Sequence, residues 1–326
     1  MSMAEWFDGA GRVCYKARFI EPMTGLFETL QNSPFRGEIL SVGSALVWAL
    51  AVLFYRVSGR AVHPLGLNLF KSLLGAGLVI LTMLLLGESL FPEKPWQDYA
   101  LLGLSGFVGI ALSDTFFFQC LNLLGASLTA VVDCLYSPFV ILFSFLFLGE
   151  RLSIRQLLGV ALILSALLLV SLSKEKGLPP KKNLLLGIGL GTLAMITLAV
   201  SIVMIKPMLA RSGVLWATLW RMAAGGAVLL VFLFIHPRRK MILGTLAVPA
   251  NWRSMVPATV LGAYISLVAW MAGMKYTLAS IAAPLNQLNS IFIFIFAALF
   301  LKERVTGAKM AAVALATVGA FLVSWA

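Results

Sequence analysis

The chain has 326 residues, of which 60% are hydrophobic and only 12% are charged. A soluble globular domain is typically about 25% charged, so this composition excludes an ordinary soluble fold. The formal net charge is +12, but the basic residues lie mostly between apolar runs, where they set topology and meet anionic lipid headgroups. We therefore expect membrane lipid as a partner and no nucleic acid.

The first 36 residues differ from the rest of the chain. They mix charged residues with scattered aromatic ones, Trp6, Phe7, Phe19 and Phe27, and contain no apolar run long enough for the core of a signal peptide. We expect this N-terminal extension, 1–36, to be either a helix lying on the membrane surface or a disordered segment.

From residue 37 onward, long apolar runs dominate. The stretches 156–173, 183–205 and 276–301 contain no charged residue. A run of roughly 20 apolar residues can cross a bilayer as a helix. The linkers between the runs are short, and the longest are expected at 174–182 (KEKGLPPKK) and 236–253. The sequence thus predicts an all-α integral membrane protein with ten transmembrane helices, at 38–57, 64–86, 99–119, 127–148, 154–173, 183–205, 214–235, 254–274, 278–301 and 306–324.

The second half of the chain repeats the first. Residues 125–173 align with residues 278–326 at an offset of 153 without a gap, and the identical pairs include Ser137/Ser290, Phe139/Phe292, Phe147/Phe300, Glu150/Glu303 and Arg151/Arg304. Upstream, Gly109 corresponds to Gly262 at the same offset, and Lys71 corresponds to Arg221. A chain that repeats itself in this way is typical of a carrier built from two related membrane units.

The repeat also predicts the domain organisation. The first unit spans 37–173, a charged linker spans 174–182, and the second unit spans 183–326. Each unit has five helices, so the second unit enters the membrane from the opposite side. The two five-helix repeats are therefore predicted to be inverted relative to each other.

Similar charged motifs follow the fourth and ninth runs: Gly-Glu-Arg-Leu-Ser at 149–153 and Lys-Glu-Arg-Val-Thr at 302–306. Glu150 and Glu303 within them are expected to cap helix N-termini. Together with the ten runs and two repeats, these motifs resemble the drug/metabolite transporter superfamily, EamA-domain type, over about residues 37–326. The resemblance implies an alternating-access carrier with one central cavity, in a cell membrane of the bacterial inner-membrane type. Such carriers take amino acids, other metabolites, drugs or nucleotide sugars, most commonly outward.

Four charged residues lie inside the predicted spans: Lys71, Asp114, Asp133 and Arg221. Each costs roughly 2.5–3.5 kcal/mol at a helix centre on insertion scales, and such residues usually face the interior or a water-filled path. One interpretation is an ion pair that holds the second, third and fourth spans together. The other makes Asp114 or Asp133 a proton carrier. Arg221 either extends to the nearby interface or binds a carboxylate.

Amides and aromatic residues suggest the rest of a substrate site. Asn286, Gln287 and Asn289 lie in one apolar run, and Asn286 and Asn289 share a helix face while Gln287 points about 100° away from Asn286. They either tie helices together or line a polar cavity. The same choice, core packing or pocket wall, applies to four aromatic residues inside the spans, Trp48, Tyr136, Trp220 and Trp270.

No motif indicates a cofactor or a metal. The three cysteines do not form a disulfide framework, His63 and His236 lack metal-ligand spacing, and no P-loop is present. A membrane-embedded enzyme such as a lipid-modifying transferase stays open, with Asp114 and Asp133 as its acid/base pair. A noncatalytic assembly subunit is a third possibility. The inverted repeat favours a carrier over both.

The function predicted from the sequence is therefore secondary active transport of a small-molecule solute. Arg221 and the amides suit a small polar metabolite with a carboxylate, such as an amino acid, moved outward. Proton coupling through Asp114 or Asp133 is one option for driving it. The alternative is multidrug or cation efflux, because Asp114 and Asp133 would attract a cation. We expect a monomer or a homodimer in contact through the fifth and tenth spans.

Overall fold

The computed structural model describes residues 33, 35–148, 153–172, 178–277, 279–303 and 305–324, and every regular element among them is helical. Most of the N-terminal extension lies outside the described residues, as do Glu150, Arg151, Arg304 and part of the 174–182 linker. In chain order the helices are α2 (Arg36–Ser58), α3 (Pro64–Leu85), α4 (Trp96–Gly106), η2 (Phe107–Leu112), α5 (Ser113–Leu124), α6 (Ala126–Asp133), α7 (Tyr136–Leu148), α8 (Ile154–Leu172), α9 (Lys181–Val203), α10 (Lys206–Ala210), α11 (Val214–Ile235), α12 (Arg239–Ala247), α13 (Pro249–Thr259), η3 (Val260–Ser266), α14 (Leu267–Tyr276), α15 (Ala279–Phe300) and α16 (Gly307–Ser324).

Seven helical stretches in the described part are long and apolar enough to cross a membrane. They are Arg36–Ser58, Pro64–Leu85, Trp96–Leu124, Ala126–Phe147, Lys181–Val203, Val214–Ile235 and Pro249–Tyr276. Three shorter apolar segments, Leu157–Ala166, Leu285–Phe300 and Gly307–Leu322, lie in α8, α15 and α16. The chain is therefore an integral, multi-pass membrane protein.

The structure corrects several predicted helix boundaries. The third and eighth predicted spans extend to Trp96–Leu124 and Pro249–Tyr276, because backbone hydrogen bonding continues into flanks that hydropathy does not mark. The fourth predicted span is broken between α6 and α7 at Cys134 and Leu135. The predicted linker 236–253 is wrong in part, since it contains α12 and the start of α13.

Both long helices contain a π-helical segment at the same place in the repeat. The offset of 153 that relates the two halves places Phe107, the first residue of η2, on Val260, the first residue of η3. Gly109 in η2 lies against Ser201 of α9, and Gly262 in η3 lies against Ala51 of α2, where an added Cβ would come within 3.0 Å of the Ala51 Cβ. Both contacts need glycine because the helices approach too closely for a side chain.

Hydrogen bonds join the halves in matched pairs. Ser113 donates from its hydroxyl to the carbonyl of Ala194 on α9 at 2.8 Å. Ser266, its counterpart at the offset of 153, donates to the carbonyl of Ser44 on α2 at 3.0 Å. The third helix of each half thus packs on the first helix of the other half.

A second matched pair joins the broken helix α6–α7 to α15. Gln287 donates from Nε2 to the hydroxyl of Ser137 at 3.0 Å, and the thiol of Cys134 donates to the hydroxyl of Ser290 at 3.4 Å. At the offset of 153, Cys134 corresponds to Gln287 and Ser137 corresponds to Ser290. These reciprocal contacts therefore join corresponding positions of the two repeats.

Glu303 connects the halves at a helix N-terminus. Its carboxylate accepts hydrogen bonds from the amides of Ala126 at 2.8 Å and Ser127 at 3.1 Å and from the Ser127 hydroxyl at 2.7 Å. The capping role is as expected for the residue type, but the helix it caps is α6 of the other half. Gly125, at φ +83°, provides the left-handed turn that brings these amides to the carboxylate.

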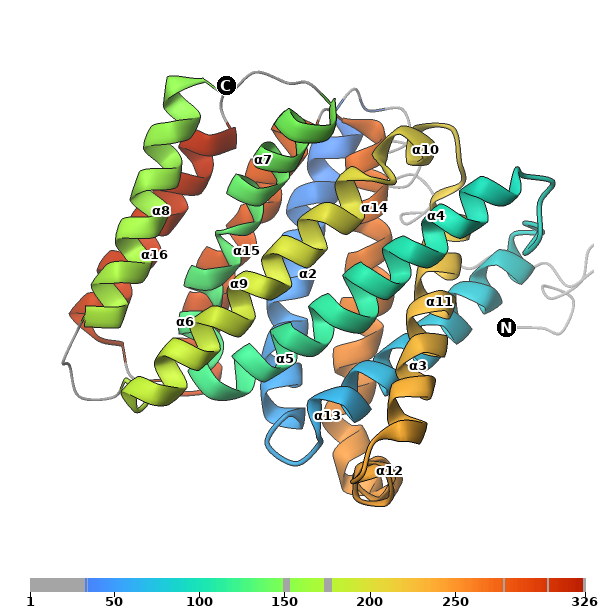
Figure 1. Cartoon of the computed structure of the whole chain (residues 1–326), viewed down its shortest axis with the longest axis horizontal. Coiled ribbons are helices and arrows are strands. Elements are labelled where there is room, and N and C mark those ends of the chain that lie inside the picture. The colour runs from blue at the N-terminus through green and yellow to red at the C-terminus, as the bar shows by residue number, and fades with distance from the viewer. Residues whose placement is uncertain are drawn as a thin grey trace, which may run out of the picture. The chain divides into compact units, whose positions relative to one another are not determined.

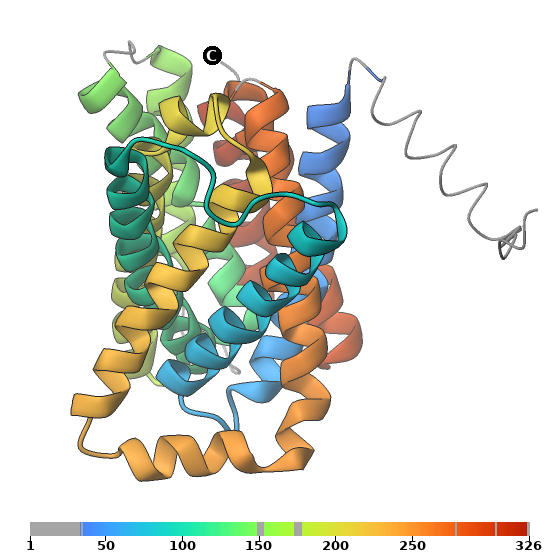
Figure 2. The ribbon, with the colours of Figure 1, turned by 90° about the vertical axis from the view of Figure 1, so that its right-hand side faces the viewer.

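The arrangement within residues 37–324 can be followed in Figures 1 and 2. Helices α8 and α16 pack side by side and run in opposite directions (Figure 1). Helix α12 lies across the ends of its neighbours, α3, α11 and α13, instead of running along them (Figure 2).

Candidate functional site

A buried ion pair lies between the second and third helical stretches. The ammonium of Lys71 on α3 bonds the carboxylate of Asp114 on α5, and their side chains are 6% and 17% exposed. The Lys71 ammonium also lies 5.8 Å from the ring centroid of Phe118. Pairing is what makes two charges tolerable in an apolar bundle. The ion pair joins the second and third spans and leaves Asp133 of the fourth span outside it, so it does not hold all three spans together.

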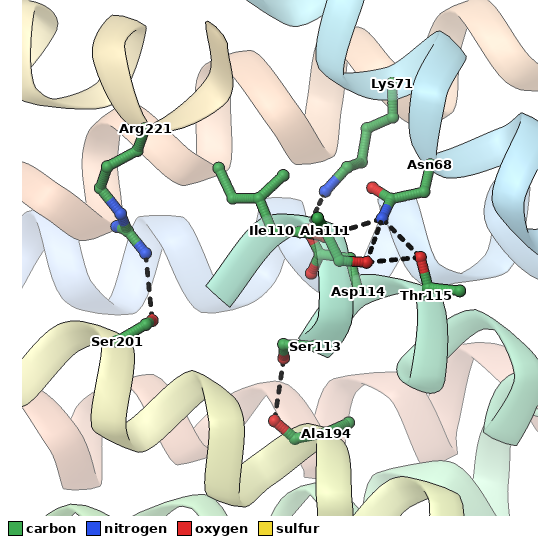
Figure 3. A network of polar contacts seen from close by, with 10 residues as sticks. All are labelled: Asn68, Lys71, Ile110, Ala111, Ser113, Asp114, Thr115, Ala194, Ser201 and Arg221. Atoms are coloured by element: carbon green, nitrogen blue, oxygen red, sulfur yellow. Dashed lines mark hydrogen bonds and ion pairs between the residues drawn. The ribbon is translucent and has the colours of Figure 1, made fainter. Parts of the chain in front are cut away.

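Asn68 holds the two partners in register (Figure 3). It is three residues before Lys71, so both side chains leave the same face of α3. Its Nδ2 donates to the carbonyl of Ile110 in η2 at 2.7 Å and to the hydroxyl of Thr115 at 3.0 Å. Asn68 thus ties α3 to the π-helical segment and to the first turn of α5, close to the residue that pairs with Lys71.

Arg221 of α11 is buried but poorly paired. Arg221 is 3% exposed, so its side chain does not extend to the membrane–water interface. One terminal nitrogen lies 3.3 Å from the sulfur of Met271, and the other lies 3.4 Å from the hydroxyl of Ser201. Its Nε has no partner, and no carboxylate in the described part lies within ion-pair distance. Gly109 makes room for this guanidinium, since a Cβ there would come 3.1 Å from its Nη2.

Asp133 is the second buried carboxylate. It ends α6, is 8% exposed, and accepts a hydrogen bond from Nδ2 of Asn289 at 3.0 Å. Asn289 in turn accepts one from the hydroxyl of Ser290 at 3.1 Å. Asp133 does not join the Lys71–Asp114 pair, and no cation of the described residues lies within ion-pair distance of it.

These groups surround one cavity of about 110 Å³ in the bundle interior. Most of the site residues expected from the sequence line it: Trp48, Lys71, Asp114, Asp133, Tyr136, Arg221, Trp270, Asn286 and Asn289. Two of the neutral donors among them, Tyr136 Oη and Trp270 Nε1, are buried and have no partner in the described part of the chain. The cavity wall therefore carries unused hydrogen-bond donors beside Arg221.

Two expected site residues do not line this cavity. Trp220 donates from Nε1 to the carbonyl of Leu90 at 3.2 Å and packs on Phe91 and Tyr99. Gln287 bonds Ser137 between the halves. Each is next in sequence to a cavity residue, Arg221 or Asn286, and one helical step of about 100° turns it away.

Sequence reasoning missed the serines of the wall. Ser44, Ser113 and Ser266 line the cavity and carry the cross-repeat hydrogen bonds described above. The candidate site residues in the spans were found chiefly through the high cost of burying a charge in an apolar helix. A serine carries no charge, so this criterion did not identify it. The available signal was the repeat itself, because Ser113 and Ser266 correspond at the same offset as Gly109 and Gly262.

Comparison with known proteins agrees with this architecture. The sequence profile of the EamA-like transporter family matches residues 35–172 and again residues 185–325. The chain belongs to the EamA-like transporter family. The two matches to this EamA-like transporter coincide with the two repeats, and members of the family are transporters.

Other comparisons add the fold alone. No curated protein matches the sequence significantly. Among the solved structures that match this EamA-like transporter is a crystal structure of a protein of no stated function, 20% identical, with a TM-score of 0.65. The alignment covers 89% of this chain and 96% of the other.

The ion pair makes a prediction for stability. We expect Lys71→Met alone to lower the free energy of unfolding by roughly 3–5 kcal/mol, because it leaves the Asp114 carboxylate buried without its cation. The double variant Lys71→Met/Asp114→Leu should recover most of this loss, since it removes both charges together. Equilibrium unfolding in detergent micelles measures both values. A double variant no more stable than Lys71→Met would contradict the ion pair.

Proposed function

We propose that this EamA-like transporter is a secondary active carrier of small solutes bearing a carboxylate, amino acids first among them, and that it exports them. The observation that carries the proposal is Arg221, a buried cation with no carboxylate partner in the described part of the chain and with the cavity beside it. An enzyme or an assembly subunit would not need this charge to face an internal space shared by both repeats.

The chemistry of Arg221 favours a carboxylate ligand. A guanidinium has five N–H donors in a planar fork, whereas here only a thioether sulfur and one serine hydroxyl lie near its terminal nitrogens. An uncompensated buried charge is costly, and a bidentate carboxylate would compensate it with two charge-assisted hydrogen bonds. Tyr136 and Trp270 offer further donors to the same anion.

Asp133 supplies the opposite charge. Because Asp114 already neutralises Lys71, the cavity retains one basic group, Arg221, and one acidic group, Asp133, that no described residue neutralises. A zwitterion with one carboxylate and one ammonium matches this balance. The small cavity volume, about 110 Å³, fits such a solute better than a bulky drug, since sites for drug-sized ligands typically measure about 300–1,000 Å³.

Alternating access requires two units that can tilt against each other around the site. We infer that the chain crosses the membrane ten times, as two inverted five-helix units, with α8, α15 and α16 among the spans. The matched Ser113 and Ser266 hydrogen bonds and the opposite directions of α8 and α16 support this inference (Figure 1). The segments η2 and η3 lie next to the cavity and are the natural points of bending, because π-helical turns interrupt regular helix bonding.

The inverted arrangement predicts the topology. Arg155 follows the fourth span and Lys302 follows the ninth, so in inverted units they lie on opposite sides of the membrane. A single cysteine at Arg155 or at Lys302, introduced into a protein with Cys14, Cys120 and Cys134 replaced, should react with a membrane-impermeant maleimide from opposite sides of sealed cells or vesicles. Labelling of both from the same side would exclude inversion.

The substrate prediction rests on Arg221. We expect amino acids to raise the thermal unfolding temperature of the purified protein, and Arg221→Gln to weaken their binding about 10- to 100-fold, because hydrogen bonds to a charged group contribute roughly 1.5–3 kcal/mol. Arg253→Gln removes an exposed arginine that does not line the cavity and should bind as the wild type does. Stabilisation by lipophilic cations alone, unchanged in Arg221→Gln, would favour cation efflux instead.

Proton coupling is predicted at Asp133. A buried carboxylate with only an amide partner is a charge that a proton can neutralise during transport, whereas Asp114 is committed to Lys71. In reconstituted vesicles, Asp133→Asn should abolish accumulation driven by a pH gradient. Substrate exchange should persist at saturating substrate, although the variant should bind more weakly because it also removes the charge proposed to face the substrate ammonium. The exposed Glu88→Gln variant should keep both activities. Full gradient-driven accumulation by Asp133→Asn would remove Asp133 from this role.

A further inference from the structure

A second cavity lies apart from the central one, between α3, α11 and α12. It measures about 620 Å³. Its walls are apolar side chains of α3 and α11, including Leu73 and Phe234, which are 51% and 66% exposed. Helix α12 adds Arg239 and Lys240, and no acidic residue lines it. The cavity is therefore a groove with apolar walls and a basic end.

The placement of α12 suits a membrane surface. It lies across the ends of α3, α11 and α13 (Figure 2). Its Ile242 is fully buried, whereas Met241 and Leu243 on either side are 50% and 49% exposed. Basic residues in the first turn and exposed apolar residues beyond it are typical of a helix at the level of lipid headgroups.

The electrostatic surroundings of the groove are positive. Residues 236–253 contain no aspartate or glutamate. Neither Arg239 nor Lys240 forms an ion pair within the described residues, and the guanidinium of Arg239 donates to the carbonyl of Phe234 at 2.8 Å. At the same end, burial lowers the pKa of His63 at the start of α3, and the nearby His236 and Arg238 lower this pKa further.

We propose that this groove binds an anionic phospholipid, with the lipid phosphate at Arg239 and Lys240 and an acyl chain along the apolar walls. Two unpaired basic side chains complement a phosphate, and α3 and α11 offer hydrocarbon contacts beside it. A zwitterionic lipid fits less well, because the groove has no acidic residue for the headgroup cation. This site is separate from the transport cavity and does not depend on which solute is carried.

Native mass spectrometry of the full-length protein tests the proposal. Delipidated protein is incubated with phosphatidylglycerol and phosphatidylcholine of identical acyl chains at equal concentrations. We expect the wild type to retain one phosphatidylglycerol in roughly tenfold preference to phosphatidylcholine, as two basic residues near an anionic headgroup predict. Arg239→Gln/Lys240→Gln should lose this preference, and the charge-keeping Arg239→Lys/Lys240→Arg should retain it.

Two further variants distinguish lipid binding in the groove from lipid binding to any basic part of the surface. Lys181→Gln/Lys182→Gln removes two exposed charges at the start of α9, at the same end of the bundle as α12 but outside the groove, and should keep the preference (Figure 1). Leu73→Trp narrows the apolar wall without changing charge and should reduce lipid retention. Three outcomes would each overturn the proposal. They are equal retention of both lipids by the wild type, an equal loss of preference in the two glutamine double variants, and unchanged lipid retention in Leu73→Trp.

Discussion

A polar group inside this apolar bundle has no bulk water to bond, so it must find its partner within the protein. That requirement explains why Lys71 and Asp114 form an ion pair and why Asn68 donates to the Ile110 carbonyl in the π-helical segment. It also explains the positions of the glycines. Gly109 and Gly262 let helices approach closely enough for short serine side chains to reach the carbonyls of the opposite half.

Several buried polar groups of each half find their partners in the other half. Ser113 and Ser266 reach carbonyls of the first helix of the other repeat, and Gln287 and Cys134 exchange bonds with the serines opposite them. Glu303 caps a helix that belongs to the first half. Neither half on its own could satisfy these groups, so the repeats stabilise each other while remaining two similar bodies. The alternating access proposed above requires such a division.

Polar and charged groups that have no partner within the protein can bind a ligand. Arg221, Tyr136 and Trp270 keep unpaired donors at the central cavity, and Asp133 keeps an unneutralised carboxylate there. Arg239 and Lys240 keep unpaired charges at the outer groove. The two sites differ in their surroundings. The first is lined by residues of both repeats, with charged and amide groups among apolar ones, and is the site proposed for a small zwitterion. The second opens between apolar helices and is the site proposed for a lipid.

The sequence alone was enough to predict membrane helices, the duplicated halves, the family resemblance and the charged residues of the cavity wall. Charges and amides are so costly in an apolar span that their positions are informative without coordinates, which is why Lys71, Asp114, Asp133 and Arg221 could be named together. It could not decide that Lys71 pairs with Asp114 and not with Asp133. Nor could it decide that Trp220 and Gln287 turn away from the cavity, that α12 lies within the predicted linker 236–253, or that Glu303 caps α6. Each of these depends on contacts between segments far apart in the chain, and on helix rotations of about 100° per residue that hydropathy does not resolve. Tertiary packing selects the partner of each polar group, because several partners of similar chemistry are available and only one lies within reach.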